Sequence, residues 1–363
     1  MKIGILTYHR SHNYGALLQA IALRKVLADM GNDVTFIDYW PKYHQHTYAF
    51  FSLAAMRREK MLNRLRYIKN CVLYAKSRYE RIKHFEKFIE EHIIPHTSSM
   101  KEEYDMIFHG SDQIWRKQPD WNTYNPVYYG MHEIKSKLKV SYAASMGSLP
   151  KKDSDRILVK KYLNNLNHIG VRELDLRDMV LNFGFKCSLD VDPTLLLSGE
   201  DWSNYFNLKK KGEEKYVLYY FLLPNTFKLD EIEQFAKGRG LKLKIIYGHA
   251  TERNTHKKIT TADPCEFLDL LYNAEYVITS SFHGLVFSIL FHKQFFASFS
   301  LNPDRAKSIL EVLQIHNRLL SPNSVIPATV GNIDYDRVEE ALSMYRNSSL
   351  NNLSELLAQN KYN

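Results

Sequence analysis

The chain has 363 residues, of which 45% are hydrophobic and 25% charged, a composition typical of a globular protein with two domains. No stretch reaches the length of a membrane-spanning helix without charges, and the first residues lack the pattern of a signal peptide, so we expect a cytoplasmic protein. A formal net charge of +9 favours anionic partners, and three widely separated cysteines (Cys71, Cys187 and Cys265) indicate neither a disulfide framework nor a thiolate zinc site.

The start of the chain predicts a strand, a helix and a second strand. The run KIGILTY at 2–8 is typical of a strand, an amphipathic stretch from about Tyr14 to Met30 is typical of a helix, Gly31 ends that helix, and DVTFIDY at 33–39 follows as a strand. Strands that alternate with helices in this way predict a parallel sheet with right-handed crossovers.

The loop between the first strand and the first helix contains His9, Arg10, His12 and Asn13. Open α/β sheets bind their ligands at the carboxyl ends of the strands, so we expect this loop to meet a ligand. Asn13 is a candidate cap for the helix, and Gly15 is expected to keep its first turn open to that ligand. No carboxylate or cysteine accompanies the histidines at metal-ligand spacing, so no metal site is predicted.

The α/β alternation stops between residues 42 and 95, where a basic, aromatic-rich helical insertion is predicted. Apolar residues recur near helical spacing at Leu62, Leu65, Ile68, Val72, Tyr79 and Phe85. Two interpretations stay open. The apolar stripe packs on the domain, or the insertion leans on an anionic membrane or receives a substrate linked to a lipid phosphate. Nucleic acid is not expected as a partner, because no recognition motif or aromatic platform is visible.

After Pro95 the strand pattern returns with polar residues at the ends of strands. A strand at 104–108 opens into Gly110, Ser111 and Asp112, where Asp112 is either a helix cap or a carboxylate presented to a ligand. A strand at 139–143 leads into the small polar loop 144–148, which contains Ser145.

Two more polar sites complete the predicted first domain. Arg172 and Glu173 stand at the end of a short strand, and the run CSLDVDPTLLL carries Asp192 and Pro193 towards an interdomain link near Leu197. We therefore predict a first domain at 1–197 and a second at 198–363. The elements expected in the second are strands at 216–222, 241–248, 276–278 and 293–300, helices at 229–240, 263–274 and 302–320, and a final helix from Tyr335.

The run YVITSSFHGLVFSILF at 276–291 is a strand followed by an apolar helix. Ser280 and Ser281 supply capping hydroxyls, His283 stands at the junction, and Gly284 allows close approach of the backbone. The positive end of a helix suits a phosphate or carboxylate, with His283 beside that anion. The alternative is a structural histidine without a chemical role.

The polar loops follow strands of both predicted domains. In two doubly wound domains such loops face one another across a cleft, which is where these proteins bind substrates. The sequence therefore predicts an α/β protein of two Rossmann-like domains facing across a cleft, with a basic helical insertion in the first.

In their order, seven motifs of the chain resemble the polysaccharide pyruvyl transferase family. The motifs are ILTYHRSHNYGALLQAIALRKVL, GSDQIW, SYAASMGS, VRELD, DPTLLL, SSFHGLVFSILF and NPDRAKSILEVLQIHNRLL. The resemblance implies the GT-B arrangement of two Rossmann-like domains. It also implies transfer of pyruvate from phosphoenolpyruvate onto a sugar as a cyclic ketal, in capsular, exopolysaccharide or cell-wall glycans.

This reaction needs cations and N–H donors for a phosphate and a carboxylate, a proton donor and a base. For the donor we expect Arg172 as the guanidinium grip, with Ser280, Ser281, Gly284 and Arg305. His283 is expected to hold the phosphate or to act as the acid, and either Asp112 or Glu173 as the base. For the glycan or lipid-linked acceptor we expect His9, Arg10, His12, Asn13, Gly15, Ser111 and Ser145.

One departure from the family pattern leaves the donor site open. Characterised members show an Arg-x-His triplet where this chain has Ser281, Phe282 and His283. Either Arg172, Arg305 and the helix terminus supply the missing charge, or the donor binds differently. The alternatives are a GT-B glycosyltransferase that uses a nucleotide sugar, with Glu311 as the candidate ribose ligand, and a non-catalytic scaffold of a glycan assembly complex.

Overall fold

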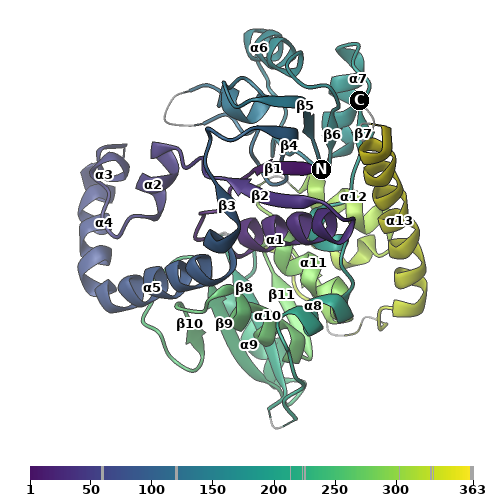
Figure 1. Cartoon of the computed structure of the whole chain (residues 1–363). Coiled ribbons are helices and arrows are strands. Elements are labelled where there is room, and N and C mark those ends of the chain that lie inside the picture. The colour runs from purple at the N-terminus through teal and green to yellow at the C-terminus, as the bar shows by residue number, and fades with distance from the viewer. Residues whose placement is uncertain are drawn as a thin grey trace.

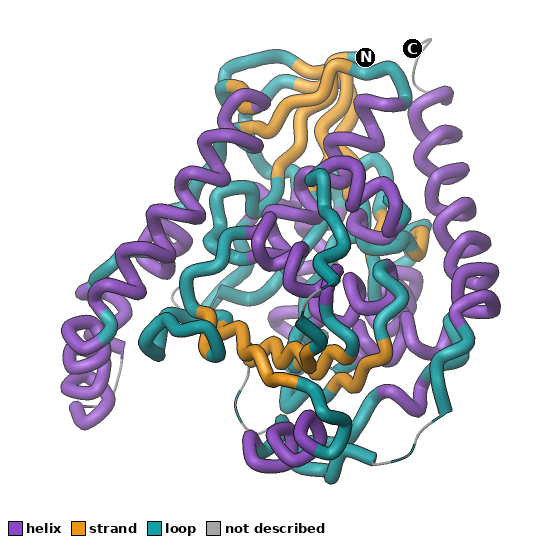
Figure 2. The backbone as a smooth tube through the Cα atoms, turned by 90° about the horizontal axis from the view of Figure 1, so that it is seen from below, coloured by secondary structure: helices purple, strands orange, loops and turns teal. Residues whose placement is uncertain are grey.

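The computed structural model describes residues 1–359 other than 59, 60, 119–121, 213, 223, 225, 302, 328 and 330. Two separate five-stranded sheets dominate it, with helices lying between them (Figures 1 and 2). The predicted pair of Rossmann-like units, with a helical insertion in the first, is confirmed. The limits predicted for the domains at 1–197 and 198–363 stay a prediction.

The first sheet is parallel throughout and has the strand order β3-β2-β1-β4-β5. Its strands are β1 (Lys2–Leu6), β2 (Asp33–Ile37), β3 (Thr97–Ser98), β4 (Tyr104–His109) and β5 (Ser136–Ser141). Parallel neighbours need a crossover, and α1 (Tyr14–Asp29) supplies it between β1 and β2. A short parallel pair, β6 (Gly170–Val171) and β7 (Ser188–Leu189), continues beyond β5 through isolated bridges.

The second sheet repeats this order as β10-β9-β8-β11-β12 and is also parallel. Its strands are β8 (Tyr216–Phe221), β9 (Lys242–Tyr247), β10 (Lys258–Ile259), β11 (Tyr276–Thr279) and β12 (Gln294–Ala297). In both sheets the order reverses beside the first strand, between β1 and β4 and between β8 and β11. Ligands of doubly wound sheets bind at such switch points.

The remaining elements cover the sheets and join them. The helices are α6 (Asp153–Leu163), α7 (Leu174–Asn182), α8 (Gly199–Tyr205), α9 (Leu229–Lys237), α10 (Pro264–Asn273), α11 (Phe282–Leu290), α12 (Asp304–Val312) and α13 (Tyr335–Gln359). The short 3₁₀ turns are η1 (Ile94–His96), η2 (Pro126–Tyr129), η3 (Pro193–Leu195) and η4 (His316–Arg318).

The insertion forms an arm of helices, α2 (Lys42–Tyr48), α3 (Leu53–Arg58), α4 (Met61–Leu73) and α5 (Ala75–His92). In Figure 1 α3 and α4 lie at the far end of the arm, and the long helix α5 leads back to the body. None of the helices in the described ranges combines the length and the hydropathy needed to cross a bilayer.

The two units share one hydrophobic core, to which both α1 and α11 contribute buried side chains. Tyr14 of α1 stacks on Phe267 of α10 with ring centroids 4.3 Å apart, and its hydroxyl donates to the carbonyl of Ala262 at 2.9 Å. At the end of the chain α13 packs back on the first unit, where the Nε of Arg346 donates to the carbonyl of Leu195. The units are therefore in direct contact and not merely tethered.

Several predicted elements end earlier than expected, and the backbone explains two of them. The strand predicted at 139–143 is β5, which stops at Ser141 because Ala143 has a φ of 46°. The helix predicted at 302–320 stops at Val312, and Gln314 takes a φ of 57° before η4 begins. The helix prediction was too long because Leu313 and Ile315 are apolar and buried although they lie beyond the end of α12.

Arg81 of α5 ties the arm to the second unit. Its guanidinium is buried and donates to the carbonyls of Gly248 and Thr260 and to the hydroxyl of Tyr14, at 3.0 to 3.2 Å.

Replacing Arg81 with methionine tests this contact. Methionine can fill the space but cannot donate a hydrogen bond, so two buried carbonyl oxygens lose their partner. We expect Arg81→Met to lower the free energy of unfolding in urea by about 2–4 kcal/mol. Lys83→Met, at an exposed position of the same helix, is the control and is expected to change it by less than about 0.5 kcal/mol.

Candidate active site

The candidate site lies where the switch points of the two sheets meet. The loops that follow β1 and β4 come from the first sheet, and the turn between β11 and α11 comes from the second. Ser281 caps α11 by accepting from the backbone N–H of Gly284 at 3.4 Å, as predicted. Side chains of both units are in contact here.

Arg172 is the centre of a buried charge cluster. It directly follows β6, and its side chain is only 2% exposed. The guanidinium forms a short ion pair with Asp192 and lies 3.5 Å from Asp112 and 3.6 Å from Glu173. Burial alone would lower the pKa of Arg172, but the three carboxylates raise it. The guanidinium is therefore charged and already paired within the protein.

Asp192 joins the two units. One of its oxygens caps η3 by accepting hydrogen bonds from the backbone N–H and the hydroxyl of Thr194. The other oxygen faces Arg172 of the first unit and lies 3.6 Å from Nε2 of His283 in the second. Burial would raise the pKa of Asp192, but His283 and Arg172 hold it well below its usual range. A permanent carboxylate thus stands between an arginine and a histidine.

His283 sits directly above Gly15. A Cβ built on Gly15 would lie 1.8 Å from Nδ1 of His283, so the imidazole occupies the space that any other residue would fill. The prediction that Gly15 keeps the first turn of α1 open to a ligand is therefore wrong, because the ring closes that space. Nε2 of His283 is buried and has no hydrogen-bond partner among the described residues.

Arg305 is the second cation of the site. It comes from the start of α12, and its guanidinium lies 4.9 Å from the ring centroid of Phe282, over which Arg172 also lies, at 5.4 Å. Burial, and next the charge of Arg172, lower the pKa of Arg305 to about 10. Within the described part of the chain no carboxylate comes within ion-pair distance of it, and its Nε lacks a hydrogen-bond partner. Arg305 therefore has unused capacity for an anion.

The two acids predicted as bases differ in their surroundings. Glu173 is buried and accepts a hydrogen bond of 2.5 Å from the hydroxyl of Ser145, and burial raises its pKa. Asp112 is half-buried and has a φ of 66°. The alternative that Asp112 caps a helix is wrong, because a turn and not a helix follows it. Ser111 completes this group by accepting from Arg172 at 3.3 Å.

The residues of the first loop have other partners. Arg10 forms a two-pronged pair with Asp38, His9 lies 3.4 Å from the same carboxylate, and His12 contacts Glu86 at 2.7 Å. Asn13 caps α1, as predicted. The described contacts of these side chains do not include the charge cluster, and their acceptor role stays a prediction. No group of three or more metal-ligating side chains is found among the described residues.

A family model described as polysaccharide pyruvyl transferase matches residues 13–300, which is more than half of the chain. The chain belongs to the polysaccharide pyruvyl transferase family. Comparison with curated protein sequences gives no significant match. Within the family's range lie His283, Arg172, Asp192 and both candidate acids.

Solved structures of low identity resemble the chain over nearly its whole length. The glycosyltransferase SnogD from Streptomyces nogalater is 12% identical, with 99% of both chains covered and a TM-score of 0.37. The UDP-GlcNAc 2-epimerase from Methanocaldococcus jannaschii is 11% identical, with 99% and 100% covered and a TM-score of 0.45. The E. coli heptosyltransferase WaaC is 10% identical, with 95% and 100% covered and a TM-score of 0.39. The fold assignment follows from the strand order of the two sheets and not from these similarities.

For a pyruvyl transferase the replacement of the family's Arg-x-His arginine by Ser281 is notable. The hydroxyl of Ser281 is used as the cap of α11, and Ser280 accepts from the N–H of Leu222 at 3.0 Å. Gly284 lets α11 pack closely on β11, since a Cβ there would lie 2.3 Å from the hydroxyl of Thr279. These three predicted donor residues therefore shape the turn, while the guanidiniums near it belong to Arg172 and Arg305.

Two residues of the site were not predicted from the sequence. In the sequence Asp192 indicates only the interdomain link, and Phe282 indicates no role. A signal for Asp192 was present, because an aspartate between apolar residues and directly before proline is expected to cap a buried turn, and a buried carboxylate needs a cation. No comparable signal distinguishes Phe282 from a core aromatic.

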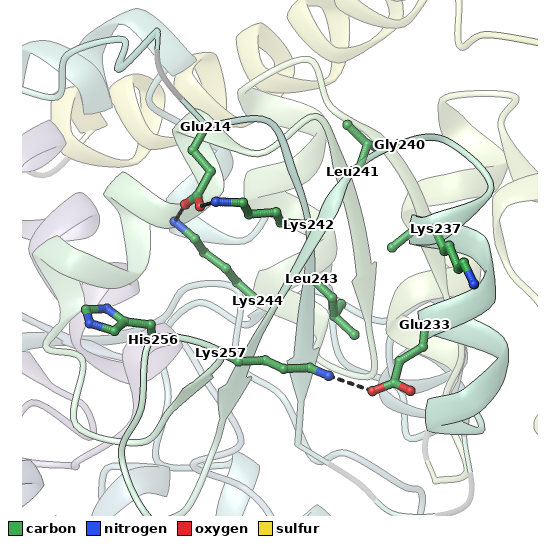
Figure 3. A pocket seen from close by; sticks show the side chains of 11 residues that line it. Glu214, Glu233, Lys237, Gly240, Leu241, Lys242, Leu243, Lys244, His256 and Lys257 are labelled. Carbon is green, nitrogen blue, oxygen red and sulfur yellow. Dashed lines mark hydrogen bonds and ion pairs between the residues drawn. The ribbon is translucent and has the colours of Figure 1, made fainter.

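One pocket lies away from this site, on the outer edge of the second sheet (Figure 3). Its volume is about 800 Å³, and α9, β9 and the loop before β10 line it. Three of its four lysines form ion pairs there, Lys242 and Lys244 with the same Glu214 and Lys257 with Glu233 (Figure 3). None of the predicted site residues lines this pocket.

The contact between Gly15 and His283 is testable by a double-mutant cycle. In Gly15→Ala the new methyl group overlaps the imidazole, so we expect the free energy of unfolding to fall by about 1–3 kcal/mol. In a His283→Ala background the ring is absent, and the same substitution is expected to cost little or to stabilise α1. Urea unfolding of the four proteins measures the coupling. Equal costs of Gly15→Ala in both backgrounds would show that the ring does not occupy this space in solution.

Asp190, two residues before Asp192, gives a pH test. Burial raises its pKa from 3.8 to about 6, so the folded protein favours the protonated acid. Its contribution to stability is therefore lost as the pH rises from about 4 to about 6, by up to about 3 kcal/mol. Asp190→Asn keeps the oxygen that accepts from the N–H of Ala143 but does not ionise. We expect the stability of this variant relative to wild type to rise over this pH range in urea titrations. A difference that does not depend on pH would contradict the assignment.

Proposed function

We propose that the chain transfers the pyruvyl group of phosphoenolpyruvate onto two hydroxyls of a sugar, forming a cyclic ketal. Membership of the pyruvyl transferase family supports the reaction class. The observation that supports the donor is Arg305, whose guanidinium has no carboxylate partner among the described residues and lies on Phe282, the neighbour of His283 in the chain. Phosphoenolpyruvate brings a phosphate and a carboxylate, and a guanidinium can bind either in a two-pronged manner.

The reaction balances without a further co-reactant. One sugar hydroxyl forms a bond to C2 of the enolpyruvyl group while the methylene carbon takes a proton. The C2–oxygen bond to phosphate then breaks, and the second hydroxyl bonds to the cation-like C2. The two hydroxyls release two protons, of which one replaces the proton taken up by the methylene carbon and the other leaves with phosphate or solvent. The protein has to supply an acid, a base and stabilisation of the departing phosphate.

Within this proposal His283 is the acid. The carboxylate of Asp192 lies 3.6 Å from Nε2 of His283 and holds the ring in place, so we assign Asp192 as a positioning residue. The charge of Arg172 is already paired with Asp192 and the two candidate bases, so we assign Arg172 the role of holding these three carboxylates in place. Of these two acids, Asp112 is the better base for a sugar hydroxyl, because it is half-buried while Glu173 is held inside by Ser145.

The acceptor and the cellular setting follow from the same proposal. We propose a glycan or a lipid-linked oligosaccharide of capsule, exopolysaccharide or cell-wall synthesis as the acceptor, modified in the cytoplasm, where phosphoenolpyruvate is formed. A ribose-binding glutamate would favour the nucleotide-sugar alternative, and its candidate, Glu311, is exposed on α12. It is kept as an outcome of the test below.

Thermal unfolding with phosphoenolpyruvate or a panel of nucleotide sugars tests the donor. A ligand that binds only the folded state at about a hundredfold its Kd adds roughly 2.7 kcal/mol of stability. We expect phosphoenolpyruvate to stabilise the wild type and Lys307→Ala, an exposed control on the same helix as Arg305. In Arg305→Ala we expect affinity to fall by about 10–100-fold.

His283→Asn separates binding from chemistry. It is expected to retain most of the stabilisation by phosphoenolpyruvate but to lose release of phosphate in the presence of an acceptor glycan. Stabilisation by a nucleotide sugar alone would replace the proposal with a glycosyltransferase. Stabilisation by neither class of donor, with or without acceptor, would favour the scaffold alternative.

A further inference from the structure

The outer face of α4 exposes a row of large apolar side chains. Leu65 is 63% exposed, Ile68 41% and Val72 74%, and their spacing of three and four residues places them on one side of the helix. The interpretation in which the whole apolar stripe packs on the domain is therefore wrong for these residues and for Tyr79, which is 64% exposed. It is right for Phe85, which is buried. The side chain of Leu62 lies outside the described residues.

The opposite side of α4 is the one that packs within the arm. Cys71 is buried, and the hydroxyl of Tyr67 accepts from the backbone N–H of Ser52 at 3.0 Å. The ring of Tyr67 also lies 5.8 Å from that of Phe51. Contacts on this side fix the rotation of the helix, so the exposed row is a stable feature of the arm.

Basic residues flank the exposed row. Arg64 and Lys69 are exposed on α4 to either side of the row, Arg66 is exposed further round the helix, and the helix contains no acidic residue. Long basic side chains beside an apolar row can lay their stems along a bilayer and place their charges among anionic headgroups. A hydrophobic row bordered by cations is the pattern of a helix that lies in the plane of a membrane interface.

We propose that α4 docks the protein on an anionic lipid bilayer, with Leu65, Ile68 and Val72 inserted at the boundary between headgroups and acyl chains. An apolar protein surface would bind the row but would have no use for the basic residues. A nucleic acid would bind the basic residues but would have no use for the apolar row. The combination fits a surface that is apolar at depth and negatively charged outside, as an anionic bilayer is.

The arm connects this docking face to the candidate active site. Helix α5 runs from α4 back to the body, where Arg81 bonds to the second unit and Glu86 bonds to His12 in the loop after β1. Docking would therefore hold the site at a fixed distance from the bilayer. If the proposed pyruvyl transfer is correct, this favours a lipid-linked acceptor, and that extension alone rests on the proposed function.

Vesicle co-sedimentation of the full chain tests the docking. The probes are vesicles of phosphatidylcholine alone and vesicles containing phosphatidylglycerol, at low and high salt. We expect wild type to bind the anionic vesicles, more weakly at high salt, and the triple variant Leu65→Gln, Ile68→Gln, Val72→Gln to bind at least about tenfold more weakly.

A matched control carries the same kind of change away from the arm. Ile157, Val325 and Met344 are 71%, 72% and 70% exposed, so replacing all three with glutamine removes similar apolar surface. This control is expected to bind as wild type does. Unfolding in urea and stabilisation by phosphoenolpyruvate check that both variants are folded, and they report on the donor independently of the membrane.

Three outcomes would overturn the docking proposal. Wild type could fail to bind anionic vesicles, the arm variant could bind as well as wild type, or both triple variants could lose binding equally. Concentration-dependent self-association that the arm variant abolishes, without vesicle binding by wild type, would assign the row to a protein interface. Loss of vesicle binding with retained stabilisation by phosphoenolpyruvate leaves the proposed function intact.

Discussion

A buried carboxylate contacts both halves of this protein at the candidate site. Asp192 is desolvated, and such a charge is tolerated only when cations and N–H donors surround it. Its partners are Arg172 in the first unit, His283 in the second and the backbone N–H of Thr194 in η3, which Asp192 caps. Each partner is in turn fixed by something else, Arg172 by two more acids and His283 by the bare backbone of Gly15. The local geometry of the candidate site therefore depends on how the two units are packed.

Much of the fold could be predicted from the sequence, because it depends on local signals. Alternating strands and helices, the cap at Asn13 and the Asp263-Pro264 start of α10 all act within a few residues of the chain. Errors occurred where the chain departs from regular dihedrals while the apolar pattern continues. The apolar residues around Gln314 continue the helical spacing of the sequence, but the backbone leaves the helix there, because Gln314 has a positive φ.

Only part of the candidate site was predictable from the sequence, and the pairing within it was not. Strand ends indicated Arg172, Glu173 and Asp112 as neighbours, since parallel strands bring their carboxyl ends to one edge, but they gave no sign that His283 of the other sheet meets Asp192. Spacing carries no information on which acid meets which cation across two domains. For that reason the contacts of Gly15 and Asp192 with His283 are visible only in the three-dimensional structure. The exposed row of α4 was equally hidden, because an apolar stripe has the same spacing whether it faces a core or solvent.

Helix α13 has a consequence for how the molecule can open. The chain passes from the first unit to the second after η3 and returns through α13, whose Arg346 bonds to Leu195 close to the outward passage. Both crossings thus lie on one flank, and α5 with Arg81 lies on the other (Figure 1). Parting the units therefore requires breaking the buried contacts of Arg81 on the side of the arm, while the two chain crossings keep the other side joined.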